Sequence, residues 1–131
     1  SMEEKDLYLP VKSLFESLEF AVQGEVNNID VVAIRDDMVV AIELKKEFSL
    51  HLIAQGAKRQ RLTDYVYIAI PKPTPKVIRG NVYKDKVYLI RRLGVGLIHV
   101  TLNKNNATAT VIEDPNLIDI KKSQYSYSYK Y

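Results

Sequence analysis

Residues 29–45 read IDVVAIRDDMVVAIELK, two apolar runs separated by an acidic pair. Both runs are rich in valine and isoleucine and carry apolar residues on both faces, the pattern of strands that are covered on two sides. The acidic pair has the length of a two-residue turn. We therefore expect strands over 29–34 and 38–44 that pair as an antiparallel hairpin.

A helix and a strand are expected before this hairpin. Apolar residues recur at helical spacing over residues 3–18, which predicts an amphipathic helix. The pattern then changes to period two over 20–26 and predicts a strand that ends at Asn27-Asn28. The three strands would form a meander that follows one helix.

A strand–helix–strand crossover is expected after the hairpin, with a helix over 49–62 and a strand over 65–70. A proline-rich loop leads to a further helix ending at Leu93, and two strands are expected over 97–101 and 107–112. This order predicts an α/β fold, with a mixed central sheet and helices on its faces.

The two turns decide which strand residues face one another. A two-residue acidic turn places Asp30 opposite Glu43, and a two-residue turn before Ile29 places Glu25 opposite Asp30. Three carboxylates then form one row, and Lys45 lies on the face of Glu43, one step farther along. Like charges across a sheet repel one another unless a cation or proton intervenes, so this row predicts a divalent metal site.

Composition limits the chemistry of such a site. The chain has no cysteine and two histidines, which excludes disulfides, zinc ribbons, iron–sulfur centres and thiol nucleophiles. A mainly carboxylate site suits hard ions such as Mg²⁺ or Mn²⁺. The alternative is that the glutamate and lysine near the strand end form a solvated salt bridge.

The spacing Asp30-x12-Glu43-Leu44-Lys45, after an amphipathic helix and before a crossover, resembles the PD-(D/E)XK nuclease superfamily. The residue before Asp30 is Ile29, where the name of the motif has proline. Further local matches lie at Asp6–Lys12, Gly24-Glu25, Asp30–Ala33, Gln55–Arg59, Asp64–Pro71 and Arg91–Gly96. With them, residues 3–115 are similar to a bacterial group described as PD-(D/E)XK-type phosphodiesterases.

This resemblance implies a restriction-endonuclease-like core over residues 2–115, followed by a tyrosine-rich tail over 116–131. It also implies that the metal is bound by Asp30, Glu43 and the carbonyl of Leu44. The catalytic positions it implies are Asp30, Glu43, Lys45, Glu4 and Gln55. Glu3 is the second choice for the acid on the first helix.

Charge is distributed unevenly along the chain. Residues 1–71 hold 8 basic and 12 acidic residues, whereas residues 72–131 hold 11 basic and 4 acidic ones. Such a division suits a protein that gathers acids at one site and binds a polyanion elsewhere, although charge also simply covers solvated surfaces. The partner we expect is nucleic acid, and DNA is the form we favour. The residues expected to bind it are Lys46, Lys58, Arg59, Arg91 and Arg92.

Three of the singled-out residues share a polar stripe on the second expected helix. His51, Gln55 and Arg59 are spaced four apart. A hydrated helix face is an equal alternative for Gln55 and Arg59, and it is the preferred interpretation for His51. His99 lies within an apolar strand and is expected to be a structural residue.

The sequence has no run of 18 apolar residues and no leader-like segment, which predicts a cytoplasmic chain without a membrane partner. The four alternating tyrosines of residues 125–131 can form an edge strand, stack on bases or be the remnant of a linker. The linker remnant is the simplest interpretation. The prediction to be tested is an edge strand, in the chain's own sheet or in that of a homodimer partner.

These expectations combine into a metal-dependent phosphodiesterase, a hydrolase that cleaves the nucleic-acid backbone with an activated water. A non-cleaving nucleic-acid-binding module on the same fold is the alternative. A structural or partner-binding domain without a nucleic-acid role is a third possibility.

Overall fold

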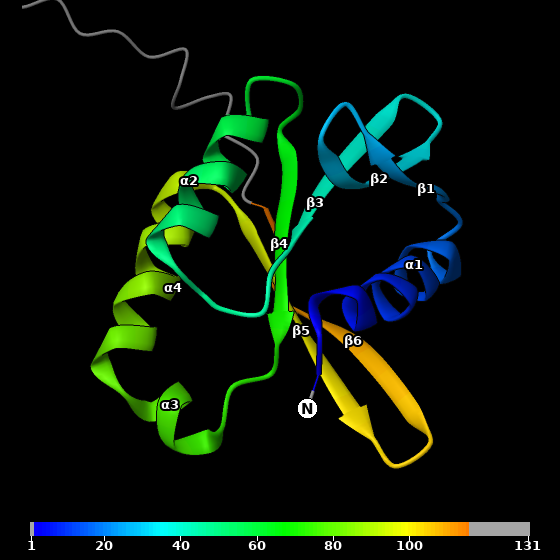
Figure 1. Cartoon of the computed structure of the whole chain (residues 1–131). Coiled ribbons are helices and arrows are strands. Elements are labelled where there is room, and N and C mark those ends of the chain that lie inside the picture. The colour runs from blue at the N-terminus through cyan, green and yellow to red at the C-terminus, as the bar shows by residue number, and fades with distance from the viewer. Residues whose placement is uncertain (1, 116–131) are drawn as a thin grey trace, which may run out of the picture.

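Six strands form one mixed sheet in which the strand order follows the sequence (Figure 1). The computed structural model describes residues 2–115. The strands are β1 (Ala21–Val26), β2 (Ile29–Arg35), β3 (Met38–Leu44), β4 (Tyr65–Pro71), β5 (Gly96–Asn103) and β6 (Asn106–Glu113). The pairs β3–β4 and β4–β5 are parallel, and the remaining three pairs are antiparallel. The predicted α/β class and mixed sheet are confirmed.

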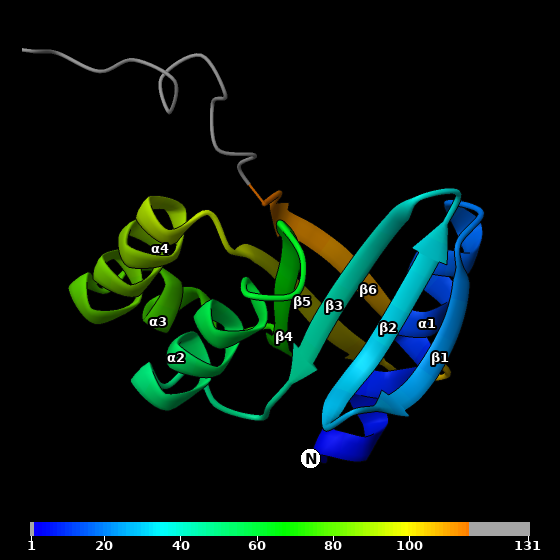
Figure 2. The ribbon, with the colours of Figure 1, turned by 90° about the horizontal axis from the view of Figure 1, so that it is seen from above.

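Helices cover both faces of the sheet. A 3₁₀ turn, η1 (Glu4–Leu7), leads into α1 (Tyr8–Ser17) on one face. On the other face lie α2 (Leu50–Arg59), α3 (Pro75–Arg79) and α4 (Asn81–Leu93) (Figure 2). Both parallel connections therefore cross on the same side of the sheet.

Local signals in the sequence account for the turns and the helix ends. Asn27 and Asn28 have φ angles of 50° and 69°, and Asp36 has a φ of 53°, a left-handed backbone that asparagine and aspartate tolerate best after glycine. The Ser49 side chain accepts a hydrogen bond from the Leu52 amide and begins α2. Both predicted hairpin turns and the predicted helix start are confirmed.

Two helical predictions needed correction. The helix expected to reach Leu62 ends at Arg59, because the amides of residues 60–62 bond three residues back in tighter turns. The single helix expected before Gly94 is two helices. They separate at Gly80, whose φ of −78° and ψ of 156° are extended rather than helical.

The sheet has an apolar core on each face. Against α2 and α4 the core includes Leu52, Ile68 and Ile90, and against η1 and α1 it includes Leu7 and Phe15. Two polar or charged residues lie buried within the described range, Glu43 and His99. Burying a charge is costly unless it is paired, so both need an explanation.

The tyrosine-rich tail, with its predicted edge strand, lies outside the described residues. Within residues 2–115, no helix has the length and apolar character needed to cross a membrane.

Candidate active site

Asp30 and Glu43 meet where β2 begins and β3 ends. The β2–β3 register pairs Val31 with Ile42 and Arg35 with Met38, as the two-residue turn predicted. The Asp30 amide donates to Glu43 Oε2 at 3.2 Å. The predicted approach of these two acids is therefore present in the structure.

The Asp30 carboxylate is held in place by the backbone of the neighbouring strand. The Leu44 amide donates to Asp30 Oδ2 at 2.8 Å. This bond places the Asp30 carboxylate beside the backbone of Leu44, whose carbonyl is a metal ligand by the resemblance. It engages one carboxylate oxygen of Asp30 and leaves the other for a further partner.

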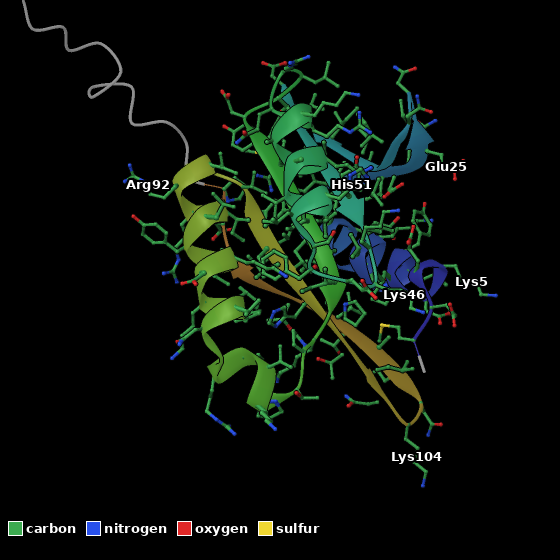
Figure 3. The ribbon with its side chains drawn as sticks, turned by 60° about the vertical axis from the view of Figure 1, so that its left-hand side comes forward. Lys5, Glu25, Lys46, His51, Arg92 and Lys104 are labelled. Atoms are coloured by element: carbon green, nitrogen blue, oxygen red, sulfur yellow. The ribbon has the colours of Figure 1, made fainter. Side chains whose placement is uncertain are left out.

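The position of Glu25 differs from the one it has in the predicted row of three carboxylates. The β1–β2 register is the expected one, with Val26 paired to Ile29. However, Glu25 has a φ of 47°, which is outside the range of a regular strand, although exposed and half-buried residues still alternate along β1. Figure 3 shows Glu25 at the outer margin of the sheet. The three-acid row is thus a close pair, Asp30 and Glu43, with a third acid at its margin.

A hollow of about 470 Å³ lies beside these acids. Its wall is lined by Glu4, Lys5, Tyr8, Gly24, Glu25, Asp30 and Leu44. Gly24 lets the Tyr8 ring approach the sheet, because a Cβ at this position would lie 3.1 Å from that ring. Acidic side chains from η1, β1 and β2 therefore line the hollow.

Arg59 pairs with Glu43 inside the protein. Its Nε donates to Glu43 Oε1 at 2.6 Å, and one terminal nitrogen donates to the Asn28 carbonyl at 2.8 Å. The Arg59 side chain is 13% exposed and the Glu43 side chain 3%. The alternative of a hydrated helix face is therefore wrong for Arg59. Its contact with nucleic acid stays a prediction, and the guanidinium is already bonded to Glu43 and Asn28.

Burial raises the pKa of the Glu43 carboxyl above its ordinary value. The hydrogen bonds from Arg59 and from the Asp30 amide oppose this effect, and the Asp30 charge adds to it. Glu43 is a buried acid whose ionised form depends on its cationic neighbour.

Lys45 pairs with Glu4, which lines the hollow, although Lys45 itself is not part of the lining. Lys45 Nζ is 3.7 Å from Glu4 Oε2, and the two side chains are 40% and 45% exposed. The acid next along the chain, Glu3, lies 3.5 Å from Lys46 Nζ. The 3₁₀ turn η1 thus brings Glu4, the acid that the resemblance favours, to the predicted catalytic lysine.

Gln55 lies one helical turn before Arg59 and is half-buried. Its Oε1 is buried and has no hydrogen-bond partner within residues 2–115. A buried acceptor without a partner costs free energy, so this oxygen calls for a donor, a water or a cation. His51, on the same stripe, is exposed as expected (Figure 3).

The donor set suits a hard divalent cation by its chemistry. Mg²⁺ is commonly held by one or two carboxylates and keeps several waters. Asp30 and Glu43 supply two carboxylates, whereas no group of three or more His, Cys, Asp or Glu side chains suited to a metal ion is found in the described part of the chain. The residues therefore fit an ion shared with water and substrate rather than a closed protein cage.

The predicted basic residues do not form one patch around the acids. Lys46 is exposed beside the site, and Lys58 is exposed on α2. Arg91 is bonded to Glu113, and Arg92 is exposed at the end of α4. The end of α4, with Arg91 and Arg92, leads into the start of the parallel strand β5, whereas the acids lie where β3 ends. Figure 3 shows Arg92 far from Lys46, which follows β3.

His99 has the structural role expected from the sequence. It is 4% exposed, and its Nε2 lies 2.9 Å from the Tyr83 hydroxyl. Burial, with a smaller effect of the Lys72 charge, lowers the pKa of His99 to about 4. The imidazole is therefore neutral at physiological pH and pairs with Tyr83.

Sequence reasoning missed two features. One is the Arg59–Glu43 pair, for which the shared stripe of Gln55 and Arg59 was the available signal. The other is a second cavity at the carboxyl end of β4, where Phe48 and Lys72 lie; the proline-rich loop was its only signal.

Comparison with known proteins adds no relative, since no family model, no curated protein and no solved structure matches this chain.

Proposed function

We propose that this protein is a metal-dependent phosphodiesterase that hydrolyses the backbone of nucleic acid, with DNA as the expected substrate. The observation that carries the proposal is the Asp30–Glu43 pair, with the Asp30 amide 3.2 Å from Glu43 Oε2 and Lys45 two residues after Glu43. The Asp30 charge raises the pKa of the nearby Glu43 carboxyl, and a divalent cation would offset this repulsion.

Each residue has a distinct part in this proposal. Asp30, Glu43 and the Leu44 carbonyl would hold Mg²⁺ or Mn²⁺. When bound, the ion would polarise the phosphate and make a water more acidic. Lys45 would neutralise charge that develops on the phosphate oxygens, and Glu4, at 3.7 Å, would orient its ammonium group. The buried Gln55 oxygen would accept a hydrogen bond from a water in the occupied site.

The element order also supports the proposal that the core is of the restriction-endonuclease type. A helix, a three-strand meander, a helix and a parallel strand follow one another as η1–α1, β1 to β3, α2 and β4. That order is the arrangement which the resemblance implies. We further propose that the protein acts in the cytoplasm.

The proposal is tested by Asp30→Asn. We expect loss of Mg²⁺ or Mn²⁺ binding by calorimetry and loss of cleavage of single-stranded, duplex and branched DNA. Folding of the metal-free variant should strengthen slightly, because repulsion between the strands is relieved and the asparagine oxygen can still accept from Leu44. Cleavage that survives in this variant, or in excess chelator, would overturn the proposal.

Asp36→Asn is the matched control. Asp36 lies in the exposed β2–β3 turn with a φ of 53°, which asparagine tolerates well. The same change of charge there should leave metal binding and cleavage as in the wild type.

A non-cleaving nucleic-acid-binding module is the second candidate. The observation that favours it is the Arg59–Glu43 pair, because a guanidinium 2.6 Å from Glu43 Oε1 already supplies the counter-charge. This candidate predicts salt-sensitive DNA binding without cleavage in any divalent metal. The first proposal predicts both binding and cleavage.

A second copy of the chain is the other partner that we propose. Sedimentation of the full chain and of a variant lacking residues 123–131 tests it. We expect a dimer that weakens when the tail is removed, and a monomer in both cases would overturn it.

A further inference from the structure

A second cavity, of about 640 Å³, lies on the other side of the connection between β3 and α2. Its lining comes from that connection, from the end of β4 with its proline-rich loop, and from the start of α4. Figure 1 shows where β4 and α4 lie in the fold. The size is that of small-molecule sites, which are mostly apolar with a few polar groups. Apolar side chains that line it include Phe48, Ile70, Pro71, Pro73, Val77 and Val82.

The rim of this cavity is cationic. Lys46, Lys72 and Lys86 line it, against the single acid Glu47. Lys86 Nζ donates to the Phe48 carbonyl at 2.6 Å and lies 5.8 Å from the centre of the Phe48 ring. An occupant that complements these groups has a flat apolar body and carries negative charge.

The cavity adjoins the acid site through consecutive residues. Lys45 pairs with Glu4 at the rim of the first hollow, and Lys46 lines the second cavity. Leu44, which lines the first hollow, also pairs with Ala69, the neighbour of Ile70 in the lining of the cavity, so one extended strand of nucleic acid can reach both places. Bases stack on aromatic rings while lysines contact phosphates, which is how single strands are commonly bound.

We propose that this cavity takes one unpaired nucleotide of the strand that is cleaved at Asp30 and Glu43. This inference rests on the proposed function and specifies its substrate class as nucleic acid with a single-stranded segment or end. A base within a duplex is stacked and would have to be flipped out before it could enter.

The test measures DNA binding by fluorescence anisotropy on the full chain in excess chelator, where cleavage plays no part. The probes are a labelled single-stranded oligonucleotide and a blunt duplex of the same length. Phe48→Leu keeps an apolar side chain but removes the ring. We expect it to weaken single-strand binding on the order of tenfold, with duplex binding unchanged.

A second variant protects the test against a folding defect in Phe48→Leu. Val82 lines the cavity, is 69% exposed and lies in the first turn of α4, where an acidic residue favours the helix. Val82→Glu should therefore fold normally and repel a strand from the cavity. Tyr88→Glu, 64% exposed on the same helix and outside the lining, makes the same change of charge and should bind as the wild type.

The outcomes separate this inference from its alternatives. A selective loss of single-strand affinity in both cavity variants supports it. Equal losses for single strand and duplex, or no loss, would overturn it, as would an absence of single-strand binding by the wild type. If Asp30→Asn still cleaves DNA, the proposed function is overturned. The binding measurements are made in chelator and therefore still test the cavity.

Discussion

The guanidinium of Arg59 is bonded to the carboxylate of Glu43, with Nε 2.6 Å from Oε1, across the interface between α2 and the end of β3. The same guanidinium donates to the Asn28 carbonyl in the turn before Asp30. One side chain thus fixes the helix, the strand and the turn that position both candidate metal ligands. Because Glu43 is 3% exposed, this pair matters for folding as well as for the site.

Arg59→Ala should destabilise the metal-free protein, because it leaves a buried carboxylate without its counter-charge. Removing one partner of a buried pair costs about 3–5 kcal/mol, and Arg59 is partly exposed, so we expect the lower end. Denaturant unfolding in chelator measures the loss. Lys58→Ala, at the exposed neighbouring position, should change stability by less than about 0.5 kcal/mol.

The same variant also tests the metal site. If Mg²⁺ binds Asp30 and Glu43, it should raise the melting temperature of Arg59→Ala more than that of the wild type, because the cation replaces the lost charge. An equal shift in the two proteins would indicate that the ion, if it binds, does so without Glu43.

Lys45→Ala should affect turnover rather than folding or metal binding. Its ion pair with Glu4 is exposed and such pairs contribute about 1 kcal/mol or less. Loss of one group that stabilises transition-state charge lowers the turnover by on the order of 10²–10³. Single-turnover cleavage kinetics beside calorimetric metal titration separate the two effects. A parallel loss of metal affinity would contradict this role.

Gln55→Met should stabilise the metal-free protein while lowering activity. The buried Oε1 of Gln55 has no partner among the described residues, and replacing an unsatisfied acceptor by an apolar group of similar shape removes a penalty of about 1–3 kcal/mol. Thermal unfolding in chelator together with cleavage rates tests both parts. A destabilised variant would mean that a water satisfies this oxygen in solution.

Local patterns were sufficient to predict most of the sheet. Asn27-Asn28 and the acidic turn at Asp36 set the registers of both hairpins, because a two-residue turn leaves one pairing for the strands beside it. The break at Gly80 could not be foreseen, since the helical periodicity continues across it and a single glycine does not by itself end a helix.

The candidate site could be predicted only in part, because local patterns fix strand register but not the packing of one element on another. Register places Asp30 opposite Glu43, which the sequence alone allows one to calculate. The inward position of Arg59 depends on the angle at which α2 packs on the sheet. The spacing of residues along a helix does not predict that angle. The left-handed backbone at Glu25, next to Gly24 and its Tyr8 contact, likewise has no signal in the alternating pattern of the strand.

His99 should make stability depend on pH between about 6.5 and 4. Its folded pKa is lowered to about 4 from an ordinary 6.5, so the unfolded chain binds more protons in this interval and stability falls as the pH falls. Over the full interval the loss amounts to about 3 kcal/mol. Glu43 acts in the opposite sense, because its raised pKa makes protonation of the folded state easier.

His99→Gln isolates the histidine contribution. Glutamine can still form a hydrogen bond with the Tyr83 hydroxyl, which lies 2.9 Å from Nε2 in the wild type, but it does not titrate. The variant is expected to lose less stability than the wild type between pH 7 and pH 4.5, whatever its stability at pH 7. Denaturant unfolding at several pH values measures the two slopes. Equal slopes would mean that the imidazole already binds its proton in the folded protein, and the buried pair with Tyr83 would then have to open over this range.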